Sequence, residues 1–157
     1  VTGWAGERIG LEVYPRPGWQ RALAYITAHE YHHVVMFRRY LDLSRPADLL
    51  DVLLSEGRAD VFARQVYPGV TAPWTDALSR TQERERWARM KPDLASTDAN
   101  IIQRWFLGSD NVPSWTIYTV GFHIMEAFLQ RHPGLDVQAW SALDAEAISR
   151  ASGYKPE

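Results

Sequence analysis

The chain has 157 residues, which suits one compact domain with a core large enough to sustain itself. Its 46% hydrophobic and 23% charged residues are ordinary for a globular protein, and its net charge of −2 gives no electrostatic reason to expect nucleic acid or an anionic membrane as a partner. Because the sequence contains no cysteine, disulfides and thiolate metal sites are excluded, so any metal ion would be held by imidazole and carboxylate groups.

No apolar stretch approaches the roughly 20 residues that a membrane span needs, and the start of the chain lacks the pattern of a signal peptide. The sequence begins at Val1 rather than Met, so it is compatible with being a piece of a longer protein that has lost a leader. We therefore expect no membrane span and slightly favour a cytoplasmic location.

The first half of the chain predicts one strand followed by two helices. Residues Arg8 to Tyr14 alternate apolar side chains with others, which is the period of a half-buried strand. From Trp19 to about Tyr40 the apolar side chains recur at helical spacing. Ser44 and Pro46 are typical of a helix start, and the helix that follows is expected to run through LLDVLLSEGRADVFARQV, before Pro68.

The second half predicts further helices. Arg80 to Lys91 is a highly charged helix with a solvated face, and Asp93 to Leu107 is a weaker helical stretch. A strongly apolar helix covers Ser114 to Arg131, and a last one runs from about Val137 to Ala151, with Gly153 as its cap. The expected fold class is therefore mainly α with a small β part.

The segment His29-Glu30-Tyr31-His32-His33 matches the pattern HExxH. At 3.6 residues per turn, His29 and His33 project from one face of a helix, so both imidazoles can reach one ion at about 2.0–2.1 Å. Glu30 points partly off that face and can hold a water molecule against the metal. The spacing therefore predicts a zinc site on this helix.

A third ligand is available on the next predicted helix. Glu56 has apolar neighbours that indicate burial, and a buried carboxylate requires a cation or a proton. Asp60 lies one turn along the same face, where it can accept the free ring N–H of a ligating histidine. Gly57 lowers helix propensity, and its small size would let the two ligand-bearing helices approach closely.

The segments around these residues resemble those of known zinc peptidases. HEYHH followed by SEGRAD is similar to the gluzincin arrangement, with HExxH on one helix and ExxxD on the next. AHEYHHVV, LLSEGRADVFA and PSWTIYTVGFHI together resemble a bacterial family of predicted zinc-dependent proteases of undefined physiological role. The resemblance implies a zincin-like fold over residues 1–157 and one Zn²⁺ bound by His29, His33 and Glu56. It also implies that Glu30 is the catalytic carboxylate and that Asp60 supports a ligand.

The resemblance further places a tyrosine three residues before a glycine, which matches Tyr118 and Gly121. The Tyr118 hydroxyl could donate to the oxyanion that develops on the scissile carbonyl, although a core aromatic is a strong competing interpretation. His123 is an alternative donor. His32 is offset from the ligand face, and we interpret it as non-ligating.

Peptidases of this kind usually have a sheet over the active-site helix, and its edge strand receives the substrate in extended form. Only about one strand precedes the motif helix in this sequence. Either the sheet is small or its other strands lie in an upstream segment, and we favour the second explanation.

We therefore expect zinc-dependent hydrolysis of peptide bonds, with a zinc-activated water and Glu30 as general base. The partner would be a peptide or protein substrate, whose cleavage specificity the sequence leaves undetermined, as it does the oligomeric state. The first alternative is a non-catalytic, zinc-stabilised binding module whose fourth ligand is His123 or His32. The second is a helical interaction module without metal.

Overall fold

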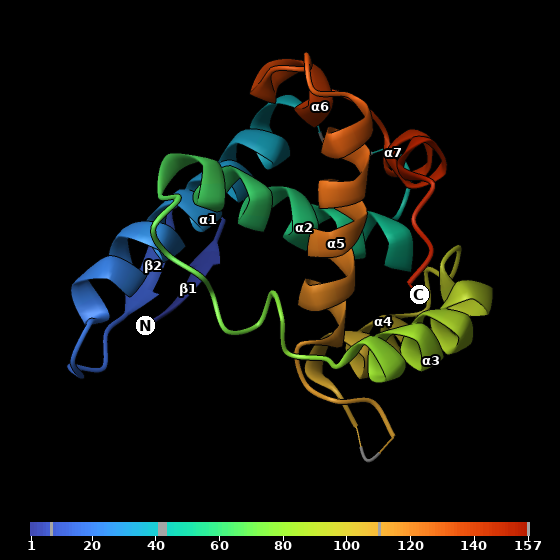
Figure 1. The fold of residues 1–157 in the computed structure, drawn as a ribbon, viewed down its shortest axis with the longest axis horizontal. Coiled ribbons are helices and arrows are strands. Elements are labelled where there is room, and N and C mark those ends of the chain that lie inside the picture. The colour runs from blue at the N-terminus through green and yellow to red at the C-terminus, as the bar shows by residue number, and fades with distance from the viewer. Residues whose placement is uncertain (7, 41–43, 110, 157) are drawn as a thin grey trace.

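The computed structural model describes residues 1–6, 8–40, 44–109 and 111–156. In this part of the chain the fold is mainly helical, with one antiparallel sheet of two strands near the N-terminus (Figure 1). Strand β1 spans Thr2–Ala5 and strand β2 spans Ile9–Glu12, with Thr2 opposite Glu12 in the ladder. The expected fold class, mainly α with a small β part, is confirmed. The predicted strand is confirmed but is shorter, and β1 was not predicted.

Helix α1 (Trp19–Arg39) carries the HExxH segment in its second half, as predicted. Helix α2 (Leu49–Val66) ends where the sequence indicated but begins later than predicted. Asp48 caps it rather than Ser44 or Pro46, because the Asp48 and Asp51 side chains each accept a hydrogen bond from the other's backbone N–H. The predicted helix start at Ser44 and Pro46 was therefore wrong. The capping box at Asp48 and Asp51 sets the start of α2 instead.

The remaining helices are α3 (Arg80–Met90), the 3₁₀ turn η1 (Lys91–Asp93), α4 (Ala99–Leu107), α5 (Thr116–Arg131), α6 (Val137–Ser141) and α7 (Ala145–Ser152). Two of the predicted helices differ from the prediction. The stretch from Asp93 to Leu107 is helical only from Ala99, as α4, and the stretch from Val137 to Ala151 is divided into α6 and α7. Asp98 and Asp144 are the N-caps of α4 and α7, since each side chain accepts a backbone N–H of the helix that follows.

Helices α2 and α5 form the centre of the molecule, with α5 crossing α2 in Figure 1. Their crossing point is a glycine pair: a Cβ at Gly57 would lie 2.2 Å from the carbonyl oxygen of Gly121. A Cβ at Gly121 would meet the carbonyl oxygen of Leu53 at the same distance, 2.2 Å. Gly57 thus permits a close helix approach, as expected, but its partner is α5 rather than α1.

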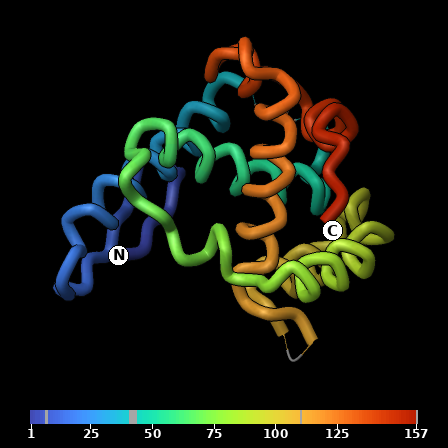
Figure 2. Tube along the Cα trace, in the orientation of Figure 1, coloured from blue at the N-terminus to red at the C-terminus, as the bar shows by residue number. Residues whose placement is uncertain are grey.

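The main core surrounds this crossing. Its fully buried members come from five helices: Leu49, Leu53, Leu54, Met90, Ile117, Val120, Ile124, Met125, Trp140 and Ile148. The tube in Figure 2 shows the segment between α2 and α3 running past α5. Thr119 of α5 fixes this segment, because its Oγ lies 2.7 Å from the carbonyl oxygen of Trp74 and 3.3 Å from the backbone nitrogen of Ala77.

No helix in the described ranges is both long enough and apolar enough to cross a membrane.

Most charged side chains of α3 are exposed, as expected for its solvated face. Glu83 is the exception, because it is buried together with Trp87 and Met90 on the inner side of the helix.

Candidate metal centre

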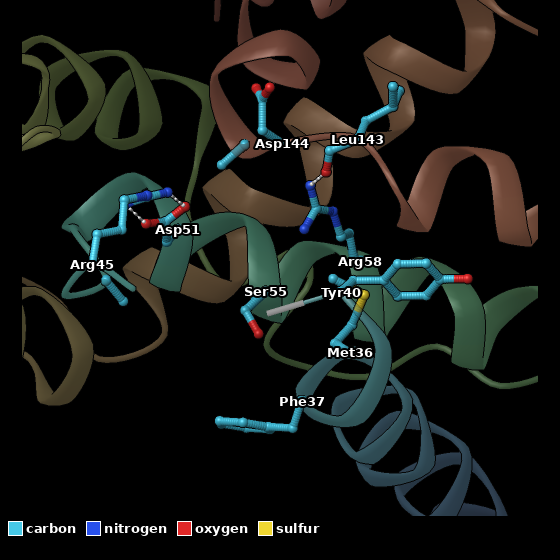
Figure 3. A pocket seen from close by; sticks show the side chains of 11 residues that line it. Met36, Phe37, Tyr40, Arg45, Asp51, Ser55, Arg58, Leu143 and Asp144 are labelled. Carbon is cyan, nitrogen blue, oxygen red and sulfur yellow. Dashed lines mark hydrogen bonds and ion pairs between the residues drawn. The ribbon is translucent and has the colours of Figure 1, made fainter. Parts of the chain in front are cut away.

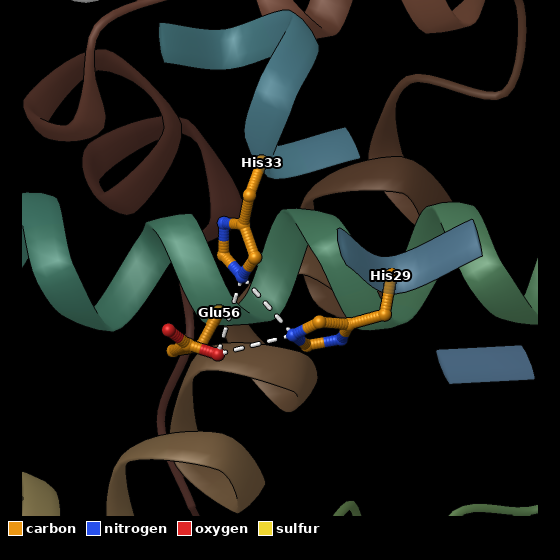
Figure 4. Close-up of side chains that lie close together, drawn as sticks. All are labelled: His29, His33 and Glu56. Carbon is orange, nitrogen blue, oxygen red and sulfur yellow. Dashed lines mark hydrogen bonds and ion pairs between the residues drawn. The ribbon is translucent and has the colours of Figure 1, made fainter. Parts of the chain in front are cut away.

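Three side chains from two helices converge on one point (Figure 4). His29 and His33 lie one turn apart on α1, and their Nε2 atoms are 3.0 Å apart. Oε2 of Glu56, on α2, lies 3.2 Å from Nε2 of His29 and 3.5 Å from Nε2 of His33. The structure thus brings together the three residues that the sequence selected as ligands.

The spacing of these atoms fits a zinc ion. Ligands placed about 2.0–2.1 Å from a tetrahedral ion stand roughly 3.3–3.4 Å from one another. The three observed separations of 3.0, 3.2 and 3.5 Å bracket that value. Two imidazoles and one carboxylate are also a donor set that zinc accepts in proteins. The residues present therefore fit Zn²⁺.

In both His29 and His33, the Nδ1 atom, on the opposite side of the ring from Nε2, lies close to a side-chain oxygen. Nδ1 of His29 lies 3.0 Å from Oδ1 of Asp60, and Nδ1 of His33 lies 3.2 Å from Oγ of Ser55. A hydrogen bond at Nδ1 fixes the tautomer that presents Nε2 as a lone-pair donor. Both supports come from α2, so this helix orients both rings. The sequence indicated Asp60 but not Ser55, although Ser55 precedes Glu56 directly.

Asp60 is itself firmly held. It is fully buried, and Nε1 of Trp74 donates to its carboxylate at 3.0 Å from each oxygen. The Tyr25 hydroxyl lies 3.2 Å from its Oδ1 and 3.1 Å from its backbone oxygen. Tyr25 could have been found in the sequence, because it lies four residues before His29 on the same stripe. Trp74 lies in the segment between α2 and α3, where the sequence gives no signal.

The carboxylates of Asp60 and Glu56 favour a positive charge on the groups that lie between them. Burial by itself lowers the pKa of His29, but the bonds to Asp60 and Glu56 outweigh it and raise that pKa well above its ordinary value. Burial alone raises the pKa of Glu56, but the bonds to His29 and His33 lower it overall. A buried group that stays ionised in this way is suited to binding a cation.

Glu30 lies next to His29, His33 and Glu56 but does not belong to this group of three converging side chains. It is buried, and β1 passes directly over it: a Cβ at Gly3 would lie 2.7 Å from Cγ and 2.8 Å from Oε1 of Glu30. Burial raises the pKa of Glu30, and the charges of Glu56 and Asp60 act in the same direction while the two ligand histidines oppose it. Only a residue without a side chain fits at position 3 without displacing this carboxylate.

A cleft of about 500 Å³ opens at the trio, lined by β1, α1, α2 and the aromatic side chains Phe106 and Tyr118. The Tyr118 ring is half-buried, 5.7 Å from Phe106 and 5.5 Å from Trp115 between ring centroids. Burial, followed by the charges of Glu56, Asp60 and Glu30, raises the pKa of Tyr118. The hydroxyl therefore stays protonated at neutral pH.

His123 does not line this cleft. Its Nδ1 lies 2.6 Å from Oε1 of Glu83, which also accepts a bond from the Tyr154 hydroxyl, and these three side chains line a different pocket. The expectation that His123 is an oxyanion donor is therefore corrected. Five residues on an α-helix turn the direction of a side chain by roughly 140°, so His123 and Tyr118 face different sides of α5.

His32 also lies apart from the trio. Its ring stacks on Trp140, with centroids 5.3 Å apart, and its Nε2 lies 3.2 Å from Oγ of Ser141. Burial, followed by the nearby positive charges, lowers the pKa of His32 to about 3, so this ring is neutral. Within the described residues, no fourth histidine or carboxylate joins His29, His33 and Glu56 in a metal-binding group.

The chain was compared with known proteins. A family model described as "Predicted Zn-dependent protease (DUF2268)" matches residues 6–150, which include His29, Glu30, His33, Glu56, Asp60 and Tyr118 but not the residues of β1 that line the cleft. No curated protein and no solved structure is similar enough to be matched to the chain.

Proposed function

The chain belongs to the DUF2268 family of predicted Zn-dependent proteases, and on this premise we propose that it is a gluzincin-type zinc metallopeptidase. The observation that carries the proposal is the convergence of His29, His33 and Glu56 with separations that suit one zinc ion. These three residues would hold the metal. Three protein ligands leave one coordination position for water, which is typical of catalytic rather than structural zinc sites.

Zinc, when bound at this centre, supplies Lewis acidity that lowers the pKa of a water molecule and polarises the scissile carbonyl group. Glu30 is the general base of the proposed reaction: its carboxylate takes a proton from the attacking water and later passes it to the leaving amine. Its raised pKa, caused mainly by burial, suits a group that must both accept and release a proton near neutral pH.

Tyr118 is the proposed oxyanion donor. It lines the same cleft as Glu30 and Glu56, and its hydroxyl keeps its proton because burial and the neighbouring carboxylates raise its pKa. A protonated hydroxyl can donate a hydrogen bond to the oxygen that becomes negative as the carbonyl carbon is attacked.

The substrate is proposed to be a peptide in extended form. Gly3, Trp4 and Ala5 of β1 line the cleft, and within the described residues β1 pairs only with β2. The second edge of β1 can thus offer backbone hydrogen bonds to an added strand. The non-catalytic alternative needed His32 or His123 as a fourth ligand, and both rings are engaged elsewhere.

The proposal is tested by metal content and turnover. Protein purified without added zinc is expected to contain one zinc per chain and to digest denatured casein until a chelator removes the metal. Glu30→Gln should keep the zinc and lose roughly 10²–10⁴-fold in rate. Glu146→Gln, the same change at an exposed position of α7, should match the wild type. The proposal fails if Glu30→Gln digests casein as fast as the wild type, or if no zinc binds.

A further inference from the structure

A second pocket, of about 140 Å³, adjoins the metal centre (Figure 3). It shares four lining residues with the zinc cleft, Phe37, Ala47, Asp51 and Ser55, so the two cavities are neighbours. Ser55 is the same residue whose hydroxyl lies 3.2 Å from Nδ1 of His33. The pocket therefore begins directly behind one of the proposed zinc ligands.

Arg58 is the unusual side chain of this pocket. It lies on α2 one turn after Ser55 and is only 6% exposed. Its Nη2 donates to the carbonyl oxygen of Leu143 at 2.7 Å, whereas its buried Nε has no partner among the described residues. Figure 3 shows the guanidinium reaching toward Leu143, on the same side of the pocket as Asp144.

The charge of Arg58 is only partly compensated. Asp51 is engaged by Arg45, whose nitrogens lie 2.6 and 2.9 Å from the two carboxylate oxygens, and Asp144 accepts the backbone N–H of Ala147 at 2.6 Å. Burial lowers the pKa of Arg58 to about 10, although Asp51 and Asp144 oppose this shift. A buried cation without a direct carboxylate partner gains more from an incoming anion than an exposed one does.

The size of the pocket limits the incoming group. At about 140 Å³ it is much smaller than the cleft of about 500 Å³ at the metal centre, which favours a short side chain over a long or aromatic one. Met36 and Tyr40 supply apolar lining that suits methylene groups, and Arg58 supplies a cation that suits a terminal carboxylate. A glutamate side chain has this size and this polarity.

On the premise that the chain is a peptidase, we propose that this pocket is a substrate subsite that takes a glutamate side chain near the scissile bond. Arg58 is the residue that determines the specificity. Its guanidinium binds the substrate carboxylate. Because Ser55 lines both this pocket and the zinc cleft, that side chain belongs to a residue within a few positions of the bond that is cut.

The first test uses cleavage by the zinc-loaded wild-type protein. In a peptide library read by mass spectrometry, glutamate should be enriched at one fixed position relative to the cut. A matched peptide with glutamine there should have a kcat/KM roughly ten- to a hundredfold lower. Arg58→Lys should shrink this ratio severalfold, whereas Arg104→Gln, which removes an exposed arginine on α4 paired with Asp93, should leave it unchanged. Equal cleavage of the two peptides would overturn the proposal.

The second test does not depend on catalysis. In protein labelled with isotopic arginine, one side-chain Nε–H resonance, the one absent from Arg58→Lys, should shift on titration with N-acetylglutamate amide. N-acetylglutamine amide should not move it. If both compounds or neither shift that resonance, the pocket does not select a carboxylate. If the resonance responds as expected but no peptide is cut, the subsite stands and the proposed peptidase function fails.

Discussion

Asp60 lies 3.0 Å from Nδ1 of His29, so the imidazole stands between this carboxylate and that of Glu56, which is 3.2 Å from Nε2. A carboxylate behind a ligating ring fixes its orientation and raises its basicity toward a metal. Because Trp74 and Tyr25 hold Asp60 in turn, the ring has little freedom to turn away from the ion.

Replacing Asp60 should therefore weaken metal binding without removing a ligand. We expect Asp60→Asn to lower zinc affinity by roughly 10–100-fold, measured by competition with a chromophoric chelator. Asp76→Asn, at an exposed position, serves as the control. Zinc affinity equal to that of the wild type in Asp60→Asn would contradict the supporting role.

Removing the Tyr118 hydroxyl should slow the reaction while leaving the metal in place. Tyr118→Phe is expected to lose roughly 10²–10³-fold in kcat, the usual cost of one oxyanion donor, with little change in KM. Tyr67→Phe removes a hydroxyl from an exposed ring and should behave as the wild type. If Tyr118→Phe keeps full kcat, the ring is only a core aromatic.

The glycine contact between α2 and α5 should not tolerate a methyl group. Gly57→Ala gains about 1 kcal/mol in helix propensity, but its Cβ would lie 2.2 Å from a backbone oxygen that cannot rotate away. We expect a net loss of about 1–3 kcal/mol in the free energy of unfolding, measured by urea denaturation. Gly69→Ala, where a Cβ meets nothing within 4 Å, should change stability little. A Gly57→Ala protein as stable as the wild type would mean that the helices pack differently.

The pair of His123 and Glu83 should make stability depend on pH. The bond to Glu83 raises the pKa of His123 above the ordinary histidine value of 6.5, although burial opposes this. The protonated pair therefore stabilises the fold fully below about pH 6.5, and this contribution is lost as the pH rises through the pKa of the folded state.

The difference in unfolding free energy between wild type and His123→Gln should accordingly be largest at acidic pH and shrink toward pH 9. Glu83→Gln should remove the same pH dependence, because it takes away the partner carboxylate. A difference that stays constant over this range would show that His123 does not titrate against Glu83.

The convergence of the proposed ligands could be predicted from the sequence, because helical periodicity decides which side chains share a face. His29 and His33 share a face through their spacing alone, and the same holds for Glu56 and Asp60 on α2. The same rule indicates that His123, five residues after Tyr118, faces another side of α5, although the sequence analysis kept it as an alternative oxyanion donor.

Features that depend on tertiary contacts could not be read in this way. Trp74 reaches Asp60 from an irregular segment, and β1 is too short to show alternation. The partner of Gly57 could have been any helix, because a glycine permits a close approach without specifying what approaches. The pocket of Arg58 is closed by Leu143, 85 residues further along the chain.

Helix α2 supplies one proposed ligand, the oxygens behind both histidine rings, and the arginine of the adjoining pocket. A small slide of this one element along α5 would shift all of these groups at once. If the proposed zinc site and subsite are correct, both depend on the position of α2, and mutations that loosen the glycine crossing should release zinc at temperatures where the helices are still folded.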